Sequence, residues 1–281
     1  MYGYGTDGPH PGGVQSSVEH RPLKLFPAPR RGAKTPMQYE ALAPIYDRLM
    51  FHVEYDEWIG LIRRVAERYG ISRRPDILEI GAGTGVVGSV LRGLGYNHIA
   101  SDLSLSMCRE ARARRGLPAC VADARCLPFK KQFGMALFLY DGINYLAAPD
   151  DYRKLFTSVY DVLAPGGLFL FDITTRANSM RHFMNYLDFE DYGDFSYVRH
   201  SWFDCRKSIQ HNDFTIYRQS AEDPRFYEKH VEAHSQKVFS VSEIERTIPR
   251  RRFRTLGIWD GYTFKKYTGK SIRVHFLLEK I

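Results

Sequence analysis

The stretch Ile77-Leu78-Glu79-Ile80-Gly81-Ala82-Gly83-Thr84-Gly85 decides the fold of this chain. It begins with a short apolar strand, expected from Asp76 to Ile80, and a helix is predicted from about Thr84 to Leu94. The glycines between them remove the Cβ obstruction and permit positive φ, while the following helix presents unpaired N–H groups. The pattern therefore predicts a loop that lets a ligand approach the backbone.

This glycine loop matches two nucleotide-binding patterns. Counted from Gly83, it fits the dinucleotide fingerprint GxGxxG, with Gly88 as the third glycine. Counted from Glu79, it fits Glu-x-Gly-x-Gly-x-Gly. Asp102 lies 21 residues after Gly81, at the end of the next predicted strand (98–101). A carboxylate there suits the ribose diol of either NAD or S-adenosylmethionine, so Asp102 alone does not decide between the patterns.

Two further features favour the second pattern. Asp123 ends a third predicted strand (119–122), where it could accept a hydrogen bond from the adenine amine, and a dehydrogenase does not need this acid. About 40 structured residues also precede the first strand. Helices expected at 38–49 and 55–69 would close over the loop as a lid, with the aromatic side chains Tyr39, Tyr46 and Trp58.

Strands and helices continue to alternate after the loop. Helices are expected at 104–114 and 150–163, and strands at 134–140 and 168–173. This rhythm predicts a parallel, doubly wound sheet whose strand carboxyl ends share one edge. Three later segments instead alternate apolar with polar residues and predict antiparallel strands: 195–203, 208–217 and 229–239. A helix at 242–247 and strands at 252–259 and 272–279 are expected to complete the sheet.

Composition narrows the class of protein. The 281 residues are 44% hydrophobic and 26% charged, which is ordinary for a globular chain. No apolar run approaches the roughly 20 residues of a membrane span, and the N-terminus lacks a secretion pattern. The four cysteines have neither metal-site nor disulfide spacing: Cys108, Cys120, Cys126 and Cys205. We therefore expect a cytoplasmic protein with reduced thiols, no metal site and no membrane partner.

The motifs, taken in order, resemble those of class I S-adenosylmethionine-dependent methyltransferases. Residues 77–85 resemble the first motif of that family, and Ser101-Asp102-Leu103-Ser104-x-x-Met107 the second-strand motif. Ala122-Asp123-Ala124-x-x-Leu127-Pro128-Phe129 is similar to the third, and Leu163-x-Pro165-Gly166-Gly167-x-Phe169-x-Phe171-Asp172 to the late strand. Tyr39-x-x-Leu42-Ala43-x-x-Tyr46-Asp47 and Asp141-Gly142-Ile143-Asn144-Tyr145-Leu146 resemble a bacterial subgroup that includes small-molecule and amino-sugar N-methyltransferases.

The resemblance implies a fold and its boundaries. The expected fold is α/β, a doubly wound, mostly parallel, seven-stranded Rossmann-like sheet with an N-terminal helical lid and an inserted antiparallel β subdomain. Residues 1–36 are rich in Gly, Pro, Ser and His, with few apolar residues and no period, and this composition separately predicts a flexible leader. Residues 37–190 and 240–281 would bind the cofactor, and 191–239 would be the insert that shapes the acceptor site.

The resemblance also assigns roles to single residues. Glu79, Gly81, Ala82, Gly83 and Gly85 would surround the methionine end of S-adenosylmethionine, and S-adenosylhomocysteine would be the product. Asp102 would hold the ribose hydroxyls. The remaining contacts would come from Leu103, Met107, Asp123 and Ala124 around adenine, Tyr140 and Asp141 near the sulfonium, and Tyr39 and Tyr46 from the lid.

Methyl transfer from a sulfonium mainly requires alignment of the nucleophile and exclusion of water. An amine or hydroxyl acceptor must also lose a proton, so we look for a base near the cofactor. Tyr145, His200 and His234 are the candidate catalytic residues, with His211 and His230 as further histidines of the insert. We expect a small-molecule acceptor, methylated on nitrogen or oxygen, and a protein that is a monomer or a homodimer.

Two other functions are compatible with the sequence. Residues 246–281 contain ten basic and two acidic residues, interleaved with aromatics, so an RNA- or ribosome-associated methyltransferase is one alternative. The basic residues are Arg250, Arg251, Arg252, Arg254, Lys265, Lys266 and Lys270 among others. The second alternative is an NAD-binding or non-catalytic nucleotide-binding protein, because a fold alone does not settle function.

Overall fold

The computed structural model describes residues 38–70, 75–130 and 132–281. All of these residues belong to one compact unit. The leader expected at 1–36 lies outside them.

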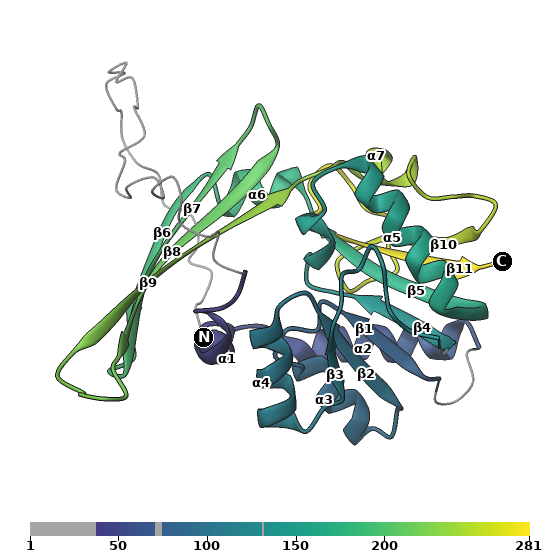
Figure 1. The fold of residues 1–281 in the computed structure, drawn as a ribbon. Coiled ribbons are helices and arrows are strands. Elements are labelled where there is room, and N and C mark those ends of the chain that lie inside the picture. The colour runs from purple at the N-terminus through teal and green to yellow at the C-terminus, as the bar shows by residue number, and fades with distance from the viewer. Residues whose placement is uncertain (1–37, 71–74, 131) are drawn as a thin grey trace, which may run out of the picture. The chain divides into compact units, whose positions relative to one another are not determined.

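Seven strands form the main sheet, in the order β10-β11-β5-β4-β1-β2-β3 (Figure 1). β1 to β5 are parallel, whereas β11 runs antiparallel to its neighbours β5 and β10. The strands are β1 (Ile77–Ile80), β2 (His98–Asp102), β3 (Ala119–Val121), β4 (Phe133–Phe138), β5 (Leu163–Thr174), β10 (Phe253–Asp260) and β11 (Arg273–Lys280). The predicted doubly wound, mostly parallel Rossmann-like sheet is confirmed. The strand order reverses between β1 and β4, and ligands bind at such a switch point.

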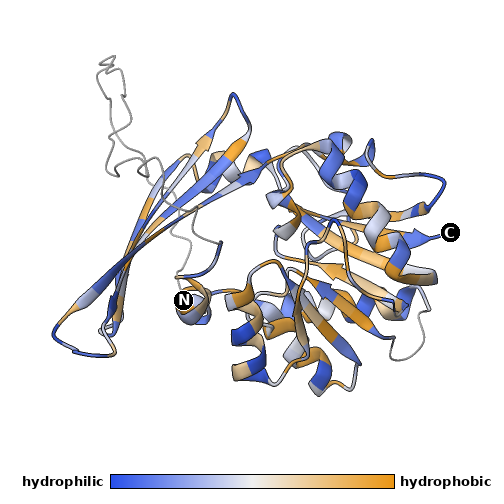
Figure 2. Cartoon of the chain, in the orientation of Figure 1, coloured by the Kyte–Doolittle hydropathy of each residue, from blue (hydrophilic) through white to orange (hydrophobic). Residues whose placement is uncertain are grey.

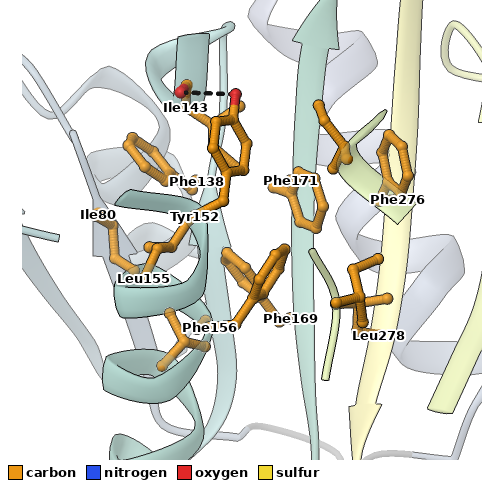
Figure 3. Close-up of a cluster of buried hydrophobic side chains, with 14 of the residues drawn as sticks. Ile80, Phe138, Ile143, Tyr152, Leu155, Phe156, Phe169, Phe171, Phe276 and Leu278 are labelled. Atoms are coloured by element: carbon orange, nitrogen blue, oxygen red, sulfur yellow. Dashed lines mark hydrogen bonds between the residues drawn. The ribbon is translucent and has the colours of Figure 1, made fainter. Parts of the chain in front are cut away.

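Helices cover both faces of this sheet. On one face, α2 (Tyr55–Arg68) and α3 (Val86–Gly93) bury apolar side chains against the strands, and α4 (Leu105–Arg115) packs on β2 and β3. On the other face lie α5 (Pro149–Val162) and α7 (Val241–Glu245). Figure 3 shows the aromatic core beneath α5, where Tyr152 donates a hydrogen bond of 3.2 Å to the carbonyl of Ile143. The central strands are correspondingly the most hydrophobic part of the chain (Figure 2).

The lid segment, which we define as residues 38–49, is less helical than the sequence predicts. It contains a 3-10 turn, η1 (Ala43–Ile45), and one short helix, α1 (Tyr46–Leu49). Pro44 has no N–H to donate within a helix, and the N–H groups of Ala41 and Leu42 donate to the Glu232 carboxylate instead. The first N–H groups of a helix have no partner within it, so the contact with Glu232 caps this segment, and the missing N–H of Pro44 is what interrupts the expected helix.

A second, four-stranded sheet confirms the antiparallel subdomain. Its strands, in order, are β6 (Asn185–Asp191), β7 (Phe195–Asp204), β8 (Ile209–Gln219) and β9 (Tyr227–Lys237) (Figure 1). The sheet begins at Asn185, before the expected boundary at 191. The sequence did not predict β6, nor the helix α6 (Arg176–His182) that precedes it. β6 is exposed along nearly its whole length, so it lacks the apolar alternation that identifies a half-buried strand.

Within the described residues, no helix is long and apolar enough to cross a membrane. The same residues contain no cluster of three or more histidine, cysteine or acidic side chains placed to hold a metal ion.

Candidate active site

The glycine loop after β1 has the conformation that its sequence predicts. Gly81, Gly83 and Gly85 have φ values of 64°, 57° and 81°, a left-handed region in which side chains are strained. Space is also short, because a Cβ on Gly85 would lie 2.4 Å from Leu117 Cδ1. The backbone of the loop is therefore exposed to an approaching ligand only because these positions are glycine.

Behind the loop, Glu79 makes a buried pair with a histidine. Glu79 Oε2 lies 2.8 Å from Nε2 of His98, which is fully buried at the start of β2. The ring fits because Gly88 leaves room, since a Cβ there would lie 2.2 Å from His98 Cε1. Gly88 thus allows α3 to pack closely on β2. The third glycine of dinucleotide fingerprints serves helix–strand packing as well, so this contact does not separate the two readings of the loop.

We expect Gly88→Ala to lower the free energy of unfolding by about 1–3 kcal/mol, the usual range for overpacking a core. Gly93→Ala, in the same helix, is the control because no atom lies within 4 Å of its added Cβ. It should be neutral or stabilise the helix by about 0.5–1 kcal/mol. Urea unfolding of both variants measures the difference, and equal stability would contradict the assigned role of Gly88.

Asp102, at the end of β2, turns its carboxylate towards the loop, and protein N–H groups occupy only some of its acceptor positions. Oδ2 accepts a hydrogen bond from Gly83 N at 2.9 Å, and Oδ1 accepts one from Ser104 N at 2.8 Å. Burial raises the pKa of Asp102, and the hydrogen bonds from Ser104 and Gly83 oppose that rise. A carboxylate has about four acceptor positions, so two positions are left for the hydroxyls of a ribose.

The four residues predicted around adenine differ in how far they are exposed. Leu103 is 61% exposed next to Asp102, whereas Met107 is 2% exposed and presents little surface. Asp123, after β3, pairs with Arg125 at 2.6 Å, and the Arg125 side chain lowers the pKa of that carboxyl. Ala124 is half-buried against the core beneath α5. Leu103 and Asp123 are thus the members of this group that are open to a ligand.

A cavity of about 60 Å³ lies over the glycine loop. Ligand pockets are typically about 300–1,000 Å³, so this cavity, whose wall includes aromatic side chains above the loop, would hold only part of a nucleotide. Those aromatic lining residues are Tyr46, Tyr55, Trp58 and Tyr140, and the floor includes Glu79, Gly81, Ala82 and Gly83. A wider, open groove of about 450 Å³ lies beside Arg125 and α5, and none of its lining residues belongs to the loop or to the lid segment.

The turn after β4 is held by a half-buried arginine. Tyr140 and Asp141 both have positive φ, 57° and 51°, which is uncommon and costly for residues other than glycine. Arg273 donates to Asp141 Oδ1 at 3.0 Å and also to Asp172, while Asp172 accepts from Asp141 N at 2.9 Å. Gln236 donates to the other oxygen of Asp141 at 2.6 Å. The Asp141 carboxylate is therefore engaged with protein groups and holds the turn in place.

Four residues from three separate parts of the chain form a closed ring of contacts. The Tyr39 hydroxyl lies 2.5 Å from that of Tyr145, and the Tyr145 hydroxyl lies 3.2 Å from His234 Nδ1. His234 Nε2 lies 3.0 Å from Glu232 Oε1, at an angle unsuited to a hydrogen bond. Glu232 closes the ring by accepting the backbone N–H of Tyr39. Burial raises the pKa of Tyr39 and of Tyr145 far above that of a free tyrosine.

The structure separates His200 from this ring. Neighbouring residues of a strand point to opposite faces of a sheet, and the pairings Ser201–Asn212 and Asn212–His234 put His234 on the face of Ser201. His200 is on the other face, where its Nε2 lies 2.8 Å from Asn185 Oδ1. Of the three predicted catalytic residues, Tyr145 and His234 are thus brought together, and His200 is not.

The sequence analysis missed Glu232 and Arg273. Glu232 stands two residues before His234 in a predicted strand, so the alternation of that strand already indicated a shared face. Arg273 had no comparable signal, because its partners Asp141 and Asp172 are more than a hundred residues away in the chain.

Known proteins resemble the chain over most of its length. Residues 77–167 match the family model described as "Methyltransferase domain". A provisionally named methyltransferase of Geobacillus sp. (strain WCH70) is 26% identical over 257 residues, covering 87% of this chain and 100% of the relative. A solved S-adenosylmethionine-dependent methyltransferase of Clostridium acetobutylicum ATCC 824 has a TM-score of 0.72 at 24% identity, covering 86% and 98% of the two chains. A sugar N-methyltransferase from Streptoalloteichus sp ATCC 53650 has a TM-score of 0.68 at 15% identity, covering 83% and 92%.

Proposed function

We propose that this class I S-adenosylmethionine-dependent methyltransferase transfers a methyl group to a nitrogen or oxygen atom of a small-molecule acceptor. The acceptor would bind between the lid segment, η2 (Gly142–Tyr145) and β9. The observation that carries the proposal is the partly buried Tyr39–Tyr145–His234 chain of hydrogen bonds, which joins the lid segment, η2 and the second sheet.

The described residues fit the cofactor. The left-handed glycines give its methionine end access to the backbone, and Asp102 keeps two acceptor positions for the ribose hydroxyls. Leu103 offers an exposed apolar surface beside Asp102 for the adenine ring. When bound, the cofactor would supply an activated methyl group on a sulfonium, which these residues would hold towards the acceptor.

The residues of the ring support proton removal from the acceptor. Because burial raises their pKa values, Tyr39 and Tyr145 stay neutral hydroxyls near pH 7 and are poor bases on their own. Each tyrosine can accept a proton and pass on its own, so the proton would move from the acceptor through Tyr39 and Tyr145 to Nδ1 of His234. The two tyrosines end unchanged, and His234 becomes an imidazolium.

The surroundings favour an amine over a hydroxyl. The Tyr39 and His234 rings are 4.4 Å apart between centroids, and Phe214 lies 6.0 Å from His234. Aromatic faces attract ammonium groups, and the carboxylate of Glu232 adds a negative charge nearby. One of the proteins of similar fold is named a sugar N-methyltransferase, which supports an amino sugar as the first class of acceptor to test.

An RNA acceptor receives less support. Arg250–Arg252 precede β10, and Lys265, Lys266 and Lys270 follow it, so these two basic groups are separated by a strand of eight residues, about 26 Å long. Of the four interleaved aromatics, Phe253 and Trp259 are buried and cannot stack on bases, whereas Tyr262 and Tyr267 are half-buried. The described cysteines are all free thiols, which supports the cytoplasm as the compartment.

The proposed acceptor class is tested by incubating the protein with methyl-labelled S-adenosylmethionine and a panel of amino sugars, other amines, hydroxyl compounds and total RNA. We expect the label in a small amine. Label in RNA, with binding that falls steeply as salt rises, would overturn the proposal in favour of a nucleic-acid methyltransferase.

With that acceptor, His234→Gln should lower kcat by about a hundredfold, the usual contribution of a general base. The dissociation constant of S-adenosylhomocysteine should not change, because His234 does not line the cavity over the glycine loop. His200→Gln is the matched control on the opposite face of the same sheet and should keep full activity. Equal effects of the two variants would remove His234 from the proposed mechanism.

A further inference from the structure

Glu232 is a buried carboxylate through which the proposed proton path does not pass. It is 3% exposed and lies on β9. Its oxygens accept the backbone N–H groups of Tyr39, Ala41 and Leu42, at 3.0 Å for Ala41 and 3.2 Å for Leu42. These three donors are about 190 residues away in the chain, at the start of the lid segment. Such convergence of N–H groups resembles the capping of a helix N-terminus, here by a side chain from another sheet.

The same carboxylate lies next to the proposed base. Glu232 Oε1 is 3.0 Å from Nε2 of His234, and the other ring nitrogen contacts the Tyr145 hydroxyl. When Tyr145 donates to Nδ1, the proton of the neutral ring is on Nε2, towards Glu232. At 3.0 Å, and without hydrogen-bond geometry, this carboxylate stabilises by its charge the imidazolium that forms when the ring takes up a proton.

The lid segment carries the other end of the hydrogen-bond chain. Tyr39 has a φ of 64°, and this strained backbone is fixed from one side by Glu232 and from the other by the Tyr39–Tyr145 contact. Leu42 and Ile45 pack on Phe195 and Ile216 of the second sheet. Figure 1 shows α1 on the side of the second sheet that faces the seven-stranded sheet. Farther along, Asp47 binds Thr84 of the glycine loop and Arg115 of α4.

We propose that Glu232 is a positioning residue that makes assembly of the proton-transfer chain depend on docking of the lid segment. Tyr46 of the lid segment is part of the wall of the small cavity over the glycine loop, so displacement of the lid would enlarge that cavity for a ligand. When the lid docks again, Glu232 binds its first N–H groups, Tyr39 returns to Tyr145, and His234 faces a carboxylate. This inference rests on the proposed function for the chemistry, but docking of the lid by Glu232 does not depend on it.

The test compares Glu232→Gln with Glu228→Gln, an exposed glutamate on the same strand. Hydrogen exchange of the peptide that contains residues 39–42 is measured without ligand and with S-adenosylhomocysteine. Losing a charged acceptor should speed exchange there by about tenfold in Glu232→Gln and leave Glu228→Gln like the unchanged protein. Dissociation of S-adenosylhomocysteine should also be faster by about tenfold, because the lid opens more often.

A second pair of variants separates docking from proton transfer. His234→Gln keeps Glu232, so residues 39–42 should stay protected while kcat falls. Tyr39→Phe keeps the backbone N–H contact with Glu232 and loses the hydroxyl, so residues 39–42 should again stay protected while kcat falls. This variant can be measured even if Glu232→Gln does not fold. With the acceptor in hand, Glu232→Gln should lower kcat more than it changes KM.

Unchanged exchange at residues 39–42 in Glu232→Gln would overturn the docking role, whatever the cofactor. Faster exchange with unchanged kcat would overturn the link to proton transfer. If the unchanged protein bound no S-adenosylhomocysteine, the proposed function would fail, and the exchange experiment without ligand would still decide the role of Glu232 in docking.

Discussion

Replacing Arg273 by methionine is expected to lower the free energy of unfolding by about 3–5 kcal/mol, the usual cost of removing one partner from a buried ion pair. Arg273 contacts both Asp141 and Asp172 and lies 5.3 Å from the centroid of the Trp58 ring. Without the guanidinium, two buried carboxylates would face each other unpaired. Domains are stable by only about 5–15 kcal/mol, so urea unfolding should show a large shift.

The loss of stability in Arg273→Met should increase as pH rises. Burial raises the pKa of Asp141 and of Asp172, and Arg273 opposes that rise. Its removal raises both pKa values further above those of the unfolded chain, so the folded variant binds more protons than the unfolded one. Its stability then falls as pH rises from about 4 through the raised pKa values. The deficit relative to the unchanged protein should therefore be larger at pH 7 than at pH 5.

Arg254→Met is the matched control. Arg254 lies on the neighbouring strand and pairs with Glu279 at the surface, where an ion pair contributes about 0–1 kcal/mol. Similar losses of stability in both variants would contradict the assigned pairing of Arg273 with Asp141 and Asp172. So would a loss of stability in Arg273→Met that does not change with pH.

Asp102→Ala is expected to weaken binding of S-adenosylhomocysteine by several hundredfold. Two hydrogen bonds from the ribose to a charged acceptor contribute about 1.5–3 kcal/mol each, and a tenfold change in affinity corresponds to about 1.4 kcal/mol. The variant also loses the acceptor for Gly83 N, which further loosens the loop. Calorimetric titration measures the affinity, and the thermal midpoint checks that the fold is intact.

Asp191→Ala is a suitable control for Asp102, because Asp191 is an exposed acid at the end of β6. It should bind S-adenosylhomocysteine like the unchanged protein. An Asp102→Ala protein that folds normally and binds with unchanged affinity would refute the cofactor geometry.

The local patterns of the sequence predict the sheet and the loop well. The glycines, the acids at the ends of β2 and β3, and the apolar strands between helices each depend on neighbours within a few residues. β6 had no such signal because its side chains are exposed, and the lid departs from a helix because Pro44 interrupts it, while a distant carboxylate caps its first N–H groups. The conformations of β6 and of the lid segment depend on contacts with residues far away in the chain.

For the candidate site too, the sequence indicated some residue types, and the tertiary structure decides which of them meet. Tyr145 and His234 could be selected as residue types, but their contact depends on how β9 lies against η2. Pairing register decides that His200 points to the opposite face, and a shift of one residue would reverse it. The role of Asp141 in holding a strained turn depends on Arg273, which comes from the last strand.

The most direct measurement is calorimetric titration of the full chain with S-adenosylhomocysteine, with NAD as the parallel control. The glycine loop, Asp102 and the lid segment are together expected to give micromolar binding of S-adenosylhomocysteine and no binding of NAD. Binding of NAD alone would contradict the assignment, because the loop would then serve as the dinucleotide fingerprint that begins at Gly83.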